Sequence, residues 1–197
     1  MASNSLNILA TAGSLNQKSV TRVVVRHVAG LLAADGCTVD ILDLAAEPLA
    51  LYNPETAHEG AIYAALKARV ERADVILLGT PDYHGCVSGT TKNFLDHFWR
   101  EFAGKLFATI VSSHEKGLTV TDQLRTVARQ CYAWTLPYGI SFTDGEDVRD
   151  GVVTGEAFKK KLAMFARDTR VYGTLLARQR AVDLAGTEPG FLERLRK

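Results

Sequence analysis

A polar loop near the start of the chain has the composition of an anion-binding site. The loop, residues 13–22, joins an apolar segment to a segment with helical periodicity. Backbone N–H groups and the positive end of the helix dipole meet at such a junction, which suits a phosphate. Short side-chain donors and one positive charge would come from Ser14, Asn16, Lys18, Ser19 and Thr21. The same residues also fit a capped helix that follows a polar loop and binds no ligand.

The spacing of glycines in this loop limits the kind of ligand that would carry the phosphate. The dinucleotide fingerprint GxGxxG is absent, because Gly13 is the only glycine of the loop. The P-loop pattern is incomplete, because the glycine that this motif requires before Lys18-Ser19 is missing. A loop with hydroxyl residues in place of glycines cannot wrap closely around a pyrophosphate. Its side-chain donors can hold one terminal phosphate. We therefore expect a mononucleotide.

Apolar runs of strand length alternate with longer segments of helical period, which predicts an α/β fold. The expected strands are residues 6–12, 38–44, 75–79, 106–111 and 136–142, and the expected helices are residues 19–34, 61–72, 90–102, 117–132 and 155–178. This pattern favours a single domain over residues 1–197, a flavodoxin-like three-layer sandwich whose five-stranded parallel sheet has the order 2-1-3-4-5. Ligands bind beyond the carboxyl ends of such strands, so the loops after the first, third and fourth strands should form the site.

The loop after the third strand carries a second motif. A strand is followed by a Thr-Pro-acidic-Tyr turn, a small loop with glycines, and a helix that opens with Lys-Asn and has an acidic residue three positions after the Asn. The residues are Thr80-Pro81-Asp82-Tyr83, Gly85, Gly89, Lys92-Asn93 and Asp96. Together with the Gly-Ser-Leu start of the first loop and its Arg22, this motif resembles the NADPH-dependent FMN reductase family, which includes quinone, chromate and azo reductases. The resemblance covers residues 6–142.

The resemblance implies an enzyme that binds FMN and takes a hydride from NADPH or NADH onto FMN N5. It places the phosphate in the first loop and the isoalloxazine ring against Pro81, Asp82, Tyr83, His84 and Gly85. The fourth loop would border the flavin through Ser112, His114 and Gly117. The electrons would pass on to a small-molecule acceptor, such as a quinone, a flavin, an azo dye or a metal oxyanion. Because the flavin carries the chemistry, no catalytic side chain is expected.

The physical properties of the third loop agree with a flavin site. A turn over residues 81–86 can offer backbone N–H groups to the ring, with Gly85 allowing close approach. Ser88 stands where many family members have proline, and the helix that begins near it directs its positive end at the site. Asp96 is expected to be structural and to bond back to loop amides. Cys86 has no resolving cysteine nearby and is not expected to act in redox catalysis.

Composition narrows the possible compartments and partners. With 23 basic and 22 acidic residues and a net charge of +1, the chain gives no electrostatic reason to expect nucleic-acid binding. The three cysteines form no CxxC pair and the histidines lack zinc-ligand spacing, so we expect a reducing compartment and no metal. We find neither a signal peptide nor a run of about 20 apolar residues, so a cytoplasmic protein without a membrane partner is expected.

Two other functions are possible on this fold. A flavodoxin-type electron carrier would be a non-enzymatic alternative, but such carriers are usually strongly acidic. A phosphorylated receiver domain would need an aspartate at the end of the third strand, where this chain has Gly79-Thr80, and is rejected. The resemblance further implies a homodimer or homotetramer, for which we expect an interface at Phe98 and Trp99. The tail, residues 179–197, would pack on a neighbouring subunit.

Overall fold

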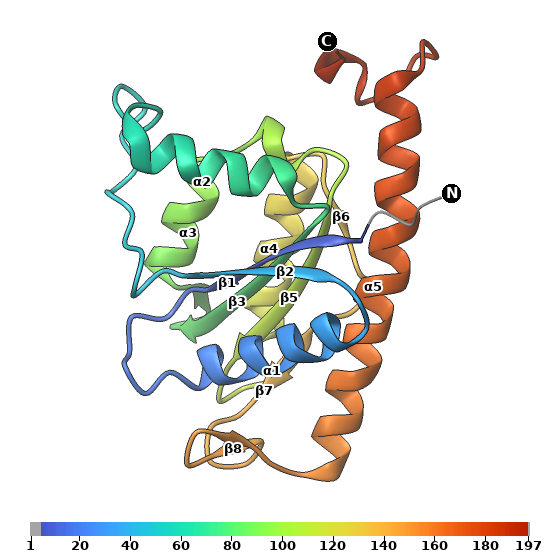
Figure 1. Cartoon of the computed structure of the whole chain (residues 1–197). Helices are drawn as coiled ribbons and strands as arrows, with labels where there is room; N and C mark the ends of the chain where they lie inside the picture. The colour runs from blue at the N-terminus through green and yellow to red at the C-terminus, as the bar shows by residue number, and fades with distance from the viewer. Residues whose placement is uncertain (1–4, 197) are drawn as a thin grey trace.

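The main sheet of the protein has its strands in the predicted order. The computed structural model describes residues 5–196. Parallel strands follow one another as β2 (Thr38–Asp43), β1 (Asn7–Ala12), β3 (Val75–Tyr83) and β5 (Leu106–Ser112). Two short strands, β6 (Trp134–Thr135) and β7 (Ile140–Phe142), both pair with β5 and together take the place of the expected fifth strand. The flavodoxin-like order 2-1-3-4-5 is therefore confirmed (Figure 1).

Helices cover both faces of the sheet and make three layers. One face packs against α1 (Val20–Ala34) and α5 (Glu156–Ala185), and the other packs against α2 (Gly60–Arg72), α3 (Gly89–Asp96) and α4 (Leu118–Gln130). Successive residues of a strand point to opposite faces. In β1, Ile8 and Ala10 accordingly belong to the core beneath α1 and α5, whereas Leu9 belongs to the core beneath the other three helices. This burial on both faces explains the nearly continuous apolar runs of the central strands.

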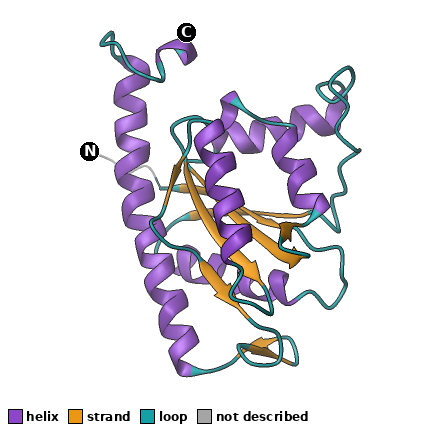
Figure 2. Cartoon of the chain, turned by 180° about the vertical axis from the view of Figure 1, so that it is seen from behind, coloured by secondary structure: helices purple, strands orange, loops and turns teal. Residues whose placement is uncertain are grey.

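Three expected elements differ from the structure at their ends. The third strand runs four residues further than expected, to Tyr83, and the last helix continues to Ala185. Of the expected strand over residues 136–142, only Ile140–Phe142 form a strand, while β6 lies before this range; Pro137, between β6 and β7, has no N–H to donate to a sheet. A small hairpin of β8 (Val148–Arg149) and β9 (Val152–Val153), absent from the prediction, stands at one end of α5 (Figure 2).

The helix expected over residues 90–102 is wrong in its second half. α3 ends at Asp96, and a short 3-10 turn follows at Arg100–Phe102. The break turns Phe98 into the core, where it is 3% exposed, so Phe98 cannot form the subunit interface that we expected. Trp99 beside it is 53% exposed. The bonds expected between Asp96 and loop amides are also wrong, because its carboxylate accepts hydrogen bonds from Lys92 Nζ at 2.6 and 2.8 Å instead.

The Lys-Asn motif at the start of α3 has a structural role. Asn93 fastens the irregular segment that follows β2 onto this helix. Its Oδ1 accepts a hydrogen bond from the Tyr52 N–H at 2.8 Å, and its Nδ2 donates to the Ala50 carbonyl at 2.9 Å. The Asn of the motif therefore holds a long loop in place.

The C-terminal tail contacts its own chain. Leu192 is 2% exposed and lies against Gly104, and Arg196 Nε donates to the Asp183 carbonyl at 2.9 Å. Contact of this tail with a neighbouring subunit stays a prediction. Across residues 5–196, no helix combines the length and the apolar character that a membrane crossing requires.

A buried lysine closes the end of α2. Lys105 is 1% exposed, and its Nζ donates to the carbonyls of Val70 at 2.6 Å, Glu71 at 2.8 Å and Ala73. These carbonyls belong to the last turn of α2, where no intrahelical donor reaches them. Burial, reinforced by the positive charge of Arg180, lowers the pKa of Lys105 to about 7. The ammonium group therefore replaces water at a helix end that the fold has buried.

Replacing Lys105 tests how much this closure stabilises the fold. We expect Lys105→Met to lower the free energy of unfolding by about 2–4 kcal/mol, because the buried carbonyls lose their donor. Removing the buried charge offsets part of this loss. Chemical denaturation followed by circular dichroism would measure the change. Lys67→Met is the matched control, since the Lys67 side chain on α2 is 40% exposed and makes only long ion pairs. Equal stability of the two variants would contradict this role.

Candidate active site

Three loops meet at the carboxyl edge of the sheet, as predicted. They follow β1, β3 and β5, which are neighbours in the sheet. The Gly13 N–H donates to the Gly79 carbonyl at 2.8 Å, which joins the first loop to β3. Ser113 Oγ donates to Asp82 Oδ2 at 2.9 Å, which joins the fourth loop to the third. The site therefore has a continuous hydrogen-bonded base.

The start of α3 is fastened to the first loop at Gly13. Ser88 Oγ and Thr90 Oγ1 both donate to the Gly13 carbonyl, at 2.5 and 2.7 Å. A Cβ on residue 13 would lie 1.8 Å from Thr91 Oγ1, so only glycine fits there. Ser88 also caps α3 by accepting the Thr91 N–H at 3.3 Å. The Ser88 hydroxyl thus serves both the first loop and the start of α3.

The first loop has the donors that a phosphate needs. Ser14 and Ser19 are buried, and their hydroxyl oxygens accept the N–H groups of Asn16 at 3.3 Å and Arg22 at 3.2 Å. Within residues 5–196, neither hydroxyl donates to a protein acceptor, so each keeps its proton for a ligand. The first N–H groups of α1 also lack intrahelical acceptors. The loop therefore fits the single phosphate of FMN.

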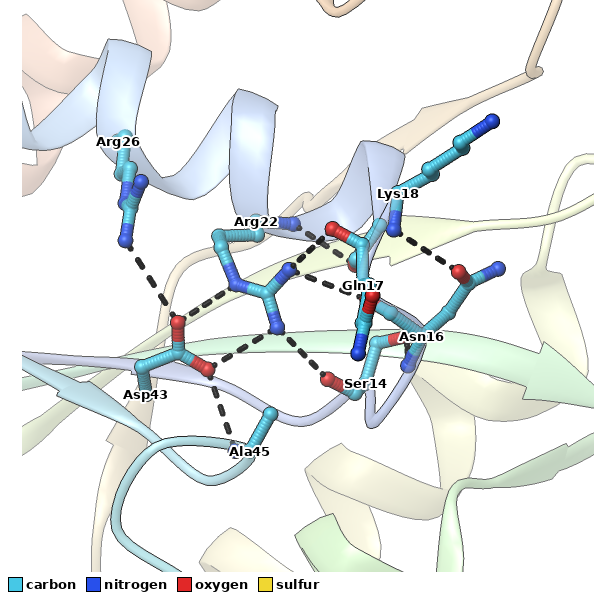
Figure 3. A network of polar contacts seen from close by, with 9 residues as sticks. Ser14, Asn16, Gln17, Lys18, Arg22, Arg26, Asp43 and Ala45 are labelled. Atoms are coloured by element: carbon cyan, nitrogen blue, oxygen red, sulfur yellow. Dashed lines mark hydrogen bonds and ion pairs between the residues drawn. The ribbon is translucent and has the colours of Figure 1, made fainter.

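The other three predicted residues of this loop have contacts of their own or point away from it. Asn16 uses its side-chain oxygen to accept the Lys18 N–H at 2.9 Å, which shapes the turn. The Lys18 side chain is exposed and extends away from the loop (Figure 3). Thr21 is buried, with its methyl group facing Gly79. Phosphate binding by these three side chains stays a prediction.

The third loop is a tight hairpin. β3 pairs antiparallel with β4 (Cys86–Val87), and the turn between them places His84 at φ 58° and Gly85 at φ 76°. Two positive φ angles are what a two-residue hairpin turn of type I′ requires, and His84 adopts a left-handed conformation that few residues other than glycine tolerate. Tyr83, 53% exposed, and His84 stand at the open rim, whereas Pro81 is buried.

Side chains of the protein bind part of the hairpin backbone, so not all of its N–H groups are free to donate to a ligand. Asp82 Oδ1 accepts the Gly85 N–H at 2.8 Å. This N–H is therefore not available to a flavin, although we expected the turn to offer its backbone N–H groups to the ring. Gln123 of α4 donates from Nε2 to the Gly85 carbonyl at 2.9 Å and accepts the Val87 N–H at 3.2 Å. The Asp82 carboxylate and the Gln123 amide therefore fix the hairpin from two sides, and the expected ring contacts of residues 81–85 stay predictions.

The fourth loop is shaped by one glycine. Gly117 adopts φ 58° at the start of α4, and a Cβ there would lie 2.7 Å from Val111 Cγ1. Ser112 is half-buried at the end of β5, and His114 is exposed. Sequence reasoning missed the neighbouring Ser113, which is buried and bonds Asp82. It also missed Gln123, whose position on an amphipathic helix gives no signal of its polar partners.

Comparisons with known proteins confirm the resemblance to the family. The family model described as NADPH-dependent FMN reductase matches residues 6–147. A NADPH azoreductase of Bacillus sp. (strain OY1-2) is 29% identical over 171 residues, covering 85% of this chain and 92% of the relative. A FMN-dependent NADPH-azoreductase of Staphylococcus haemolyticus is 29% identical over 146 residues, covering 70% and 77%.

Solved structures agree on the fold. The apo form of the NADH:FMN oxidoreductase EmoB aligns with a TM-score of 0.72 at 16% identity, covering 85% of this chain and 90% of that one. FerB of Paracoccus denitrificans, an NAD(P)H:(acceptor) oxidoreductase, aligns with a TM-score of 0.71 at 21% identity, covering 88% and 98%. The chain therefore belongs to the NADPH-dependent FMN reductase family and is a flavin-dependent oxidoreductase that uses FMN and NADPH.

Proposed function

We propose that the protein passes electrons from NADPH through FMN to a planar two-electron acceptor, with aromatic azo compounds as the favoured class. The observation that carries the proposal is the contrast between a hydrogen-bonded base, with Gly13 and Ser88 buried and Asp82 half-buried, and an exposed rim at Tyr83 and His84. A rigid base suits a resident flavin, and an open rim admits two substrates in turn. The names of the curated relatives favour the azo class over quinones, flavins and metal oxyanions.

The protein's own groups would position the reaction. FMN, when bound, supplies a hydride acceptor at N5. Ser14, Ser19 and the start of α1 hold the phosphate, and the hairpin at residues 82–87 supports the ring. Tyr83 packs at the ring edge and shapes the nicotinamide pocket. Because the rim is open, water can deliver the proton that accompanies electron transfer to the acceptor.

Anaerobic stopped-flow measurements test the proposed activity. We expect NADPH to bleach the flavin absorbance in the first half-reaction, and an azo dye such as methyl red to restore it in the second. A flavodoxin-type carrier would not be reduced by NADPH, so the first half-reaction separates the two functions. Rapid bleaching followed by reoxidation with a quinone and not with the dye would contradict the azo assignment.

The proposal that no side chain is essential for catalysis has its own test. We expect His84→Ala, His114→Ala and Cys86→Ser each to lower the rate of flavin reduction by less than about tenfold, whereas loss of a general acid or base costs about 10²–10⁴-fold. Tyr83→Ala should lower the rate more, and Tyr83→Phe should restore most of it, because packing matters rather than the hydroxyl. A loss of more than about a hundredfold in His84→Ala, with FMN fully bound, would show that this histidine does chemistry.

We also propose that the protein is a cytoplasmic homodimer or homotetramer. Trp99, Tyr132 and Phe191 line one pocket, and Trp134 lies against Phe191. All four side chains are about half-exposed, and exposed aromatic patches commonly mark interfaces. Light scattering at micromolar concentration should give the mass of a dimer or tetramer. The Trp99→Ser variant should shift this mass toward the monomer, and a monomeric wild-type protein would exclude the assembly.

A further inference from the structure

Arg22 occupies a position where it would first be taken for a phosphate ligand. It lies in the first turn of α1, directly after the loop that carries Ser14 and Ser19. Its guanidinium, however, points at the backbone of residues 14–17 and at Asp43 (Figure 3). Its side chain is 12% exposed, so the group is largely removed from water.

All the donors of this guanidinium are used within the protein. An arginine has five N–H donors in a fixed planar fork. Nη1 donates to the carbonyls of Asn16 at 3.1 Å and Gln17 at 3.2 Å, and Nη2 donates to the Ser14 carbonyl at 3.3 Å. The remaining two bonds go to Asp43, from Nε at 2.6 Å and from Nη2 at 3.2 Å. Five acceptors match five donors, which leaves none for a phosphate.

Asp43 holds the guanidinium and balances its charge. It ends β2, and its register partner Ala12 immediately precedes the loop in β1. Its Oδ1 also accepts the Ala45 N–H at 3.2 Å. Burial on its own would raise the pKa of Asp43, but the hydrogen bonds from Arg22 and Ala45 outweigh it and hold the pKa below the usual value. The pair therefore adds little net charge to the loop.

Two of the three bonds to carbonyls set the direction of N–H groups in the loop. In a planar trans peptide, the N–H points opposite to the carbonyl. Binding the carbonyls of Ser14 and Asn16 to Arg22 thus turns the N–H groups of Leu15 and Gln17 away from the guanidinium, toward the side on which a phosphate would bind. It also draws away carbonyl oxygens that would repel an anion.

We propose that Arg22, held by Asp43, is a positioning residue that keeps the phosphate loop in its binding conformation and is not itself a phosphate ligand. This inference rests on the proposed phosphate site in the first loop. Lysine at this position would keep the positive charge, but it has three donors on one atom and cannot span three carbonyls and a carboxylate.

Binding of FMN and of riboflavin to the apoprotein separates the possible roles, because riboflavin carries the same ring without the phosphate. We expect Arg22→Lys to raise the Kd for FMN by at least about tenfold and to change the Kd for riboflavin by less than about threefold. Asp43→Asn should act in the same direction. Arg26→Met is the matched control, because Arg26 also contacts Asp43, at 3.6 Å, but makes no bond to the loop. Quenching of flavin fluorescence gives both constants.

The outcomes distinguish this inference from the site on which it rests. Wild-type affinity for FMN in Arg22→Lys would show that charge alone matters and would overturn the inference. Equal weakening of FMN and riboflavin in both Arg22→Lys and Asp43→Asn would indicate general damage to the fold and would also overturn it. If Ser14→Ala with Ser19→Ala leaves the Kd for FMN unchanged, the phosphate lies elsewhere and the proposed site itself fails. Thermal unfolding of each apoprotein checks that the variants are folded.

Discussion

The close approach of Gly13 to the start of α3 is the constraint on which the rest of the site depends. Two hydroxyl groups, from Ser88 and Thr90, converge on one carbonyl, and the space that a side chain would need at residue 13 is filled by Thr91. This contact joins the loop after β1 to the loop after β3. In the proposed function, the phosphate and the ring of FMN bind to these two loops, so their separation must match the length of the ligand. A side chain at residue 13 would force them apart.

Charges at this edge of the sheet are mostly neutralised before any ligand binds. Arg22 is paired with Asp43, and Lys92 is paired with Asp96. Apart from the exposed Lys18, what remains for the phosphate is the partial positive charge of a helix N-terminus together with hydroxyl and backbone donors. Such a set recognises an anion by geometry, with a modest net field, because each donor must already point at the ligand. A preorganised loop is therefore worth more here than an additional lysine.

The sequence was informative where local pattern and burial agree. The apolar runs of β1 and β3 predicted buried parallel strands, and Ser19 predicted the start of α1. The break after Asp96 was hidden, because Phe94, Phe98 and Phe102 keep a helical spacing while the backbone passes through a 3-10 turn. The Arg22–Asp43 pair was hidden for another reason. Its members are 21 residues apart, and only the pairing of β1 with β2 brings them together.

The site divides into a part that is fixed from within and a part that faces solvent, and the division has a chemical consequence. The Asp82 and Gln123 side chains form hydrogen bonds with the hairpin backbone. They therefore fix the position of the hairpin but do not determine which ligand it contacts. Tyr83 and His84 at its tip have exposed side chains. A nicotinamide and an electron acceptor must use the same open side in turn, so this rim cannot be shaped closely around either one. If the proposed function holds, we expect the fixed part to select the flavin and the rim to accept a broad range of planar molecules that can reach its ring.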